Sequence, residues 1–119
     1  MMSQLAIQTP QGHRVVAAQS GGSIPAGLAL TLVPLDGDPT GYAQWSVTHV
    51  ASGMRIGPGC DERRTAQRVA EALADVADWT LPAFALKALP HLEAEVSATL
   101  DRVLTELERA LGQFELGAR

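Results

Sequence analysis

YAQWSVTHVASGMRIG, residues 42–57, is the stretch that decides the fold of this chain. Residue types alternate over 42–50, and alternation predicts a strand because successive side chains of a strand point to opposite faces. Residues 51–53 suit a three-residue hairpin loop in which Gly53 adopts the positive φ that the turn requires. Residues 54–57 then form the return strand. This stretch therefore predicts a β-hairpin.

One face of the predicted hairpin carries a tryptophan, a histidine and an arginine. Trp45, Val47 and His49 share that face, and the three-residue loop would bring His49 close to Arg55 across the pair. If the face is exposed, these side chains can stack on a base or hold an anion. If it is buried, Trp45 and Val47 anchor the hairpin to the core, and His49 bonds to backbone at the core's edge. The sequence leaves both interpretations open.

Three further strands are predicted before the hairpin, over residues 3–9, 13–19 and 28–34, with turn signals between them. The third of these places apolar residues at every second position, which is typical of a strand with one side on a core: Leu28, Leu30 and Leu32. The sequence predicts an antiparallel β-meander of four to five strands over residues 3–57.

Helical patterns follow the meander. Apolar residues at steps of three and four predict a helix over about residues 61–77, with Asp61 or Thr65 as its N-cap. A short helix is predicted over 82–89. A longer one, over about 90–112, opens at Pro90 and has Gly112 as its natural stop. With both main helices packed on one face of the sheet, the expected fold is a single α+β domain spanning residues 1–119.

The last predicted helix carries a seam of apolar residues with the spacing of a coiled coil. Leu104 and Leu111 widen it on one side. The seam residues are candidates for a dimer interface: Val96, Leu100, Val103, Leu107 and Phe114, with Ala110. The same face can instead pack on the chain's own sheet, as most short amphipathic helices do. A small core with few aromatic residues favours association, because dimerisation would bury additional apolar surface.

Arginines gather where the predicted hairpin meets the first helix: Arg55, Arg63, Arg64 and Arg68. Three of them lie at or near a helix N-terminus, which itself attracts anions. Together with Trp45 and His49 they form a candidate surface for binding a macromolecule. The alternative is a solvated surface on which Asp61 and Glu62 neutralise part of the charge.

Signals for catalysis are weak. Cys60 follows a Gly-Pro-Gly turn near a helix start and basic residues, a setting that would lower a thiol pKa, but no base can be placed beside it from the sequence. The three histidines lack ligand spacing, so neither a metal site nor a cofactor is expected. No glycine-rich stretch has the pattern of a phosphate-binding loop. The expectation is a protein that is not an enzyme.

Charge is unevenly distributed along the 119 residues. The net charge of the chain is −4, made of +1 over residues 1–70 and −5 over residues 71–119. An acidic C-terminal part is unsuited to lying along a phosphate backbone. One cysteine excludes an internal disulfide, and no apolar run approaches a membrane span. A cytoplasmic location is expected, because the start of the chain lacks the pattern of a signal peptide.

Residues 42–79 resemble, at the level of fold, small DNA-binding modules of the integrase arm-binding type, in which a sheet enters the major groove and a helix packs behind it. The resemblance rests on Trp45, Gly53, Ala66 and Ala70. It implies nucleic-acid binding, which is the second hypothesis for this chain. The first is a small cytosolic interaction protein that associates with itself or with another protein.

Overall fold

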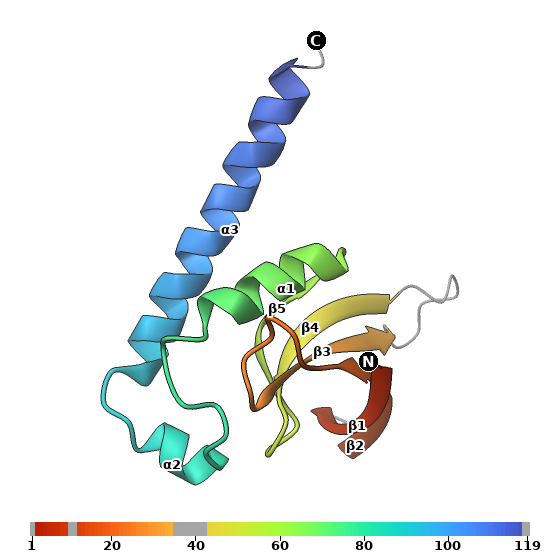
Figure 1. Ribbon diagram of the computed structural model, residues 1–119, viewed down its shortest axis with the longest axis vertical. Coiled ribbons are helices and arrows are strands. Elements are labelled where there is room, and N and C mark those ends of the chain that lie inside the picture. The colour runs from red at the N-terminus through yellow and green to blue at the C-terminus, as the bar shows by residue number, and fades with distance from the viewer. Residues whose placement is uncertain (1, 10–11, 35–42, 118–119) are drawn as a thin grey trace.

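The computed structural model describes the backbone of residues 2–9, 12–34 and 43–117, and the side chains in these ranges from residue 3 to residue 109 (Figure 1). The predicted α+β fold is confirmed: a five-stranded antiparallel sheet is followed by helices. The elements are β1 (Met2–Thr9), β2 (Gly12–Gln19), β3 (Leu28–Pro34), β4 (Ala43–His49), β5 (Met54–Cys60), α1 (Arg63–Ala72), α2 (Ala83–Lys87) and α3 (Leu92–Gly117).

The sheet is a meander with the strand order β1-β2-β3-β4-β5. Leu30 on β3 lies opposite Val47 on β4, and both are buried. Their face is covered by α1, whose Ala66 and Ala70 are fully buried in the same cluster. Because alanine is small, α1 lies close across β3, β4 and β5 (Figure 1). This face of the sheet holds the main apolar core.

The register of the β4–β5 hairpin differs from the predicted one by one residue. His49 pairs with Met54, so Arg55 lies opposite Thr48. A shift of one residue moves a side chain to the other face of a sheet. The prediction that Arg55 shares a face with His49 and Trp45 was therefore wrong. Val50 lengthens the loop, because its N–H bonds to the carbonyl oxygen of Gly27, at 2.9 Å, and not across the hairpin.

The sheet curls until its two ends meet. The backbone N–H of Gln8 on β1 donates a hydrogen bond of 2.9 Å to the carbonyl oxygen of Gly53, in the turn between β4 and β5. Gly53 has the predicted positive φ, at 71°. A Cβ atom there would lie 2.7 Å from the carbonyl oxygen of Ala6, so the close approach requires glycine. The curl encloses the face of the sheet that α1 does not cover.

β5 is longer than predicted, because the Gly-Pro-Gly sequence bends the strand without ending it. Trp45 pairs with Cys60 and Val47 with Ile56, so extra residues of β5 bulge between these pairs. Gly57, at a φ of 84°, lies in the bulge. The strand therefore continues to Cys60 and ends shortly before the start of α1.

α1 is shorter than the predicted helix over 61–77. It begins after Glu62, which makes no side-chain capping bond, and ends at Ala72. The chain then turns back, and the indole Nε1–H of the buried Trp79 donates to the carbonyl oxygen of Leu73 at 2.8 Å. This contact uses a carbonyl group at the end of the helix and fixes the segment that leads to α2.

α3 begins at Leu92 and runs to Gly117, so the prediction that Gly112 ends it was wrong. A single glycine costs a helix only about 1 kcal/mol. The first part of α3 packs against α1, and Leu100 also reaches β5, where a Cβ on Gly57 would lie 3.1 Å from its Cδ2. The C-terminal part of α3 runs away from the sheet (Figure 1).

Candidate functional site

A cavity of about 430 Å³ opens on the curled face of the sheet, opposite α1. We call it the sheet cavity. Its lining comes from all five strands and the β4–β5 turn: Ile7, Gln8, Thr9, Arg14, Val33, Pro34, Ser46, Thr48, Gly53 and Arg55. The volume is within the range of about 300–1,000 Å³ that small-molecule sites occupy.

Two arginines line the sheet cavity, one from the second strand of the meander and one from the last. Arg14 lies on β2 opposite Ile7 and is half-buried, and Arg55 lies on β5 opposite Thr48 and is exposed. They meet in one cavity because the sheet curls. Among the described residues that line it, none is acidic. The part of the lining that the structure describes thus offers guanidinium donors to a ligand.

Hydroxyl groups are buried beneath the cavity. Thr31, Ser46 and Thr48 are at most 2% exposed and lie on neighbouring strands of the curled face. The hydroxyls of Thr31 and Thr48 are 2.8 Å apart and share a hydrogen bond, and the Thr31 hydroxyl also donates to the carbonyl oxygen of Ser46 at 3.3 Å. The middle of this face is therefore polar where an ordinary sheet core would be apolar.

Trp45 and His49 lie on the α1 side of the sheet. Trp45 is half-buried against the core, and His49 is only 3% exposed. The His49 ring lies between two partners: Nδ1 is 2.7 Å from the hydroxyl of Ser52, and Nε2 is 2.8 Å from the carbonyl oxygen of Leu81. A carbonyl only accepts, so Nε2 carries a proton. These contacts match the anchoring interpretation of the hairpin.

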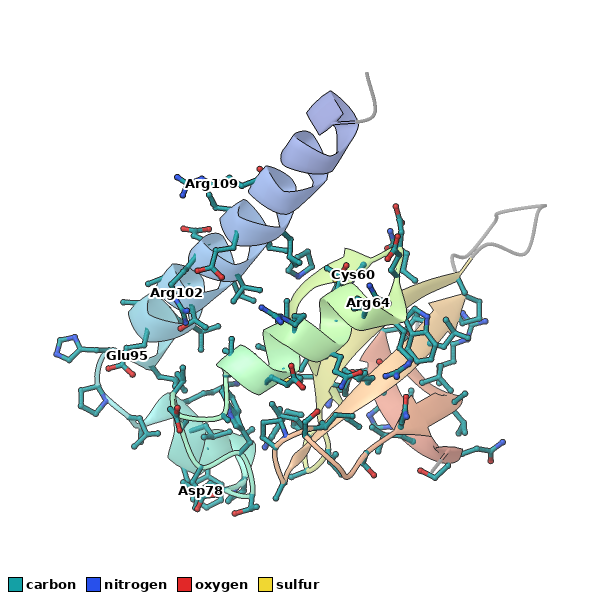
Figure 2. All side chains as sticks on the ribbon, turned by 45° about the horizontal axis from the view of Figure 1, so that its top comes forward. Cys60, Arg64, Asp78, Glu95, Arg102 and Arg109 are labelled. Atoms are coloured by element: carbon teal, nitrogen blue, oxygen red, sulfur yellow. The ribbon has the colours of Figure 1, made fainter. Side chains whose placement is uncertain are left out.

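The candidate arginine surface is divided by the sheet. Arg63, Arg64 and Arg68 are exposed on α1, whereas Arg55 lines the cavity on the other face. Arg63 donates to the side-chain oxygen of Gln67 at 2.7 Å, and Figure 2 shows Arg64 on α1. The interpretation as one continuous cluster of four arginines was wrong. The register of the hairpin is the reason.

Cys60 is buried, at 8% exposure, as part of the core. Burial raises the pKa of its thiol, and the neighbouring Asp61 carboxylate raises it further. From the sequence, the helix start and the nearby arginines were expected to lower this thiol pKa, and that expectation was wrong. A thiol with a raised pKa is a poor nucleophile at neutral pH, because the thiolate is the reactive form.

A second groove separates the β4–β5 turn, β1 and α2. Three of its side chains are exposed large apolar residues: Val50, Met54 and Phe84, the last at 78% exposure. Lys87 and His13 lie on the same groove. Exposed apolar side chains gathered in this way are typical of a surface that contacts another molecule.

The sequence-based candidate sites missed Arg14 and the buried hydroxyls. A signal for the hydroxyls was present, because alternation already placed Ser46 and Thr48 on the face opposite Trp45. Arg14 sits far from Arg55 in the sequence, and only the curl of the sheet brings the two to one cavity. Local patterns do not contain that information.

Comparisons of the chain with models of protein families, with curated proteins and with solved structures found no significant match. Within the described ranges, no group of three or more His, Cys, Asp or Glu residues is placed to hold a metal ion. The helices of that same part of the chain include none long and apolar enough to cross a membrane.

Proposed function

We propose that this chain is a small non-enzymatic interaction protein of the cytosol that associates with a second copy of itself through α3. The observation that carries the proposal is the reach of α3. Among the described side chains, Leu107 is the last on α3 that packs on the core, yet the helix continues to Gly117. Ten further residues extend it by about 15 Å.

A helix end of this length is marginal in water without packing. The sequence continues the apolar seam into it, with Leu111 and Phe114 at the spacing set by Leu107. Nearer the domain, Val96, Leu100, Leu104 and Leu107 are only partly buried, although they contact the core. Such a wide face can touch the domain on one side and a second α3 on the other.

Because α3 is acidic, two copies of it can associate only through apolar contacts and not through charge. Residues 92–117 contain six carboxylates and two guanidinium groups, hence a net charge of −4. Two such helices repel one another at low salt. Glu95, Arg102 and Arg109 are exposed along the helix (Figure 2). Added salt screens the repulsion, so we expect association to tighten with ionic strength.

Two groups that could carry chemistry are occupied by structural roles, which supports a non-enzymatic function. Cys60 is buried with a raised thiol pKa, and His49 is held between Ser52 and Leu81. The exposed apolar side chains beside α2 are a further surface suited to contact with a protein.

Nucleic-acid binding is the second hypothesis, and it has less support. It relied on Arg55, Arg63, Arg64 and Arg68 acting on one surface with Trp45 and His49. The sheet separates Arg55 from the other three, and His49 is buried. Binding to phosphates weakens as salt rises, which is the opposite of the response expected for α3 pairing.

Light scattering of the chain as it elutes from a sizing column tests the proposal. Phe114→Glu places a charge on the seam, and Thr105→Glu places the same charge on an exposed position away from it. We expect the unmodified chain and Thr105→Glu to have the mass of a dimer, and Phe114→Glu that of a monomer. A monomer mass for the unmodified chain at high concentration would remove the proposal.

A further inference from the structure

We propose that the sheet cavity binds a small organic anion, a molecule that joins a phosphate or carboxylate group to an apolar part. Arg14 and Arg55 hold the anionic group, and Ile7, Val33 and Pro34 contact the apolar part. This site is separate from the α3 face, and the proposal does not depend on self-association.

The two arginines of the cavity favour an anionic ligand. Arg14 and Arg55 lie on the same face of the curled sheet, and both line the cavity. Guanidinium groups present forked donors that match the oxygens of a carboxylate or phosphate. Arg14 is half-buried, and an electrostatic interaction is stronger where water is partly excluded. An anion therefore gains more here than at the exposed arginines of α1.

The buried hydroxyls give the cavity a polar floor. Ser46 and Thr48 line it, and Thr31 lies beneath them, bonded to Thr48. Burying three hydroxyl residues in the middle of a sheet stabilises the fold less than apolar residues of the same shape. A binding role accounts for this choice, because the Ser46 hydroxyl can donate to an anion. The Thr48 hydroxyl, whose proton goes to Thr31, can still accept from a ligand O–H.

The apolar wall and the volume of the cavity determine which non-ionic part a ligand can carry and how large it can be. Ile7 is buried, Val33 is half-buried, and both line the cavity with Pro34. A volume of about 430 Å³ admits one small molecule and no folded segment. An apolar group of the ligand can therefore lie on this wall while its anionic end meets the arginines.

Backbone hydrogen bonds of the sheet hold the walls of the cavity in place. The hydrogen bond from Gln8 to Gly53 holds β1 against the β4–β5 turn, and both residues line the cavity. A preformed site loses less conformational entropy when it binds. Removal of an arginine should therefore change affinity and leave the fold in place.

Titration of the isotope-labelled chain by NMR tests the site, with phenyl phosphate, benzoate and inorganic phosphate as probes and benzyl alcohol as the neutral control. We expect saturable shifts at Thr48, Gly53 and Arg55 with phenyl phosphate, benzoate or both, and none with benzyl alcohol. Inorganic phosphate, which lacks the apolar part, should bind more weakly than phenyl phosphate. Comparison of phenyl phosphate with benzoate distinguishes a phosphate site from a carboxylate site.

Two arginine variants locate the binding. Arg55→Gln should weaken the binding of the organic anions by about tenfold, the effect of losing one charged donor. Arg64→Gln makes the same change of charge on α1, outside the cavity, and should leave binding unchanged. Unchanged melting temperatures would show that both variants are folded.

The proposal is overturned by any of three results: no saturable shift with either organic anion at millimolar concentration, equal weakening by both variants, or binding of benzyl alcohol as tight as that of benzoate. A short single-stranded oligonucleotide that binds more tightly than phenyl phosphate, and that loses affinity in Arg64→Gln, would also overturn it in favour of a nucleic-acid surface.

Discussion

The backbone N–H of Gln8 and the carbonyl oxygen of Gly53, 2.9 Å apart, join the first strand of the sheet to the last hairpin turn. The side chain of Gln8 adds a second bond, from Nε2 to the carbonyl oxygen of Ser52 at 3.4 Å. A five-stranded meander could remain open, with its ends far apart. These contacts curl it, and the curl creates the sheet cavity and brings Arg14 and Arg55 to one place.

Gly53→Ala should open this junction. The substitution combines a positive φ with a Cβ placed 2.7 Å from the carbonyl oxygen of Ala6, so we expect a loss of about 3 kcal/mol in the free energy of unfolding. Gly22→Ala is the matched control, because Gly22 has a φ of 62° and open space around it. That variant should lose only about 1 kcal/mol. Urea unfolding measures both.

Hydrogen exchange at the amide of Gln8 gives a local measurement of the same prediction. Exchange should accelerate in Gly53→Ala, because the acceptor of that N–H moves, and stay slow in Gly22→Ala. Equal losses of stability in the two variants, with Gln8 protected in both, would mean that the junction does not hold the curl.

His49→Ala should destabilise the fold by about 2–4 kcal/mol. The substitution leaves a cavity in the core and removes the donor from the carbonyl oxygen of Leu81. His13 is exposed on β2, so His13→Ala should change the free energy of unfolding by no more than about 0.5 kcal/mol. Thermal unfolding of the pair tests the structural role of His49. A His49→Ala protein as stable as His13→Ala would contradict it.

Trp79→Phe should cost about 1–2 kcal/mol, because it removes the hydrogen bond to the carbonyl oxygen of Leu73 while keeping most of the buried area. The loss is limited, since the N–H of Val76 also donates to that oxygen, at 3.1 Å. Chemical denaturation measures the change. No loss of stability would show that the indole N–H does not fix the end of α1.

Cys60 should react slowly with iodoacetamide at neutral pH in the native chain and normally in the chain unfolded by urea, because burial raises the thiol pKa and limits access. The raised pKa also links stability to pH. The folded chain favours the neutral thiol, so this contribution is complete below the thiol pKa of the unfolded chain and is lost as pH rises through the folded pKa.

Cys60→Ala provides the control for this linkage. Unfolding of the unmodified chain should become easier at alkaline pH, and part of that dependence should be absent from Cys60→Ala. A native thiol that reacts as fast as the unfolded one at neutral pH would show that Cys60 is accessible. That result would favour a catalytic role for its thiol.

Local patterns were sufficient for much of the fold. The alternation of Leu28, Leu30 and Leu32 predicted a strand with one side on the core, and the first two are almost fully buried beneath α1. Gly53 was correctly assigned a positive φ. Both signals depend on a residue and its immediate neighbours, and this is why they could be interpreted from one sequence.

The predictions that were wrong or missing concern features that depend on contacts between residues distant in sequence. Val50 joins the loop because Gly27 supplies the acceptor for its N–H, and this one residue moved Arg55 to the other face. The indole of Trp79 returns to Leu73, the residue that follows α1, although Val76 and Ala77 continue the helical spacing. The sheet cavity depends on the meeting of Gln8 and Gly53. No local pattern contains these contacts.

Sedimentation equilibrium of the unmodified chain, over a range of concentrations at low and high salt, tests the central claim most directly. Pairing through an α3 of net charge −4 predicts a monomer–dimer equilibrium that shifts towards dimer as ionic strength rises. A monomer at every concentration and salt would contradict the claim, as would a dimer that dissociates when salt is added.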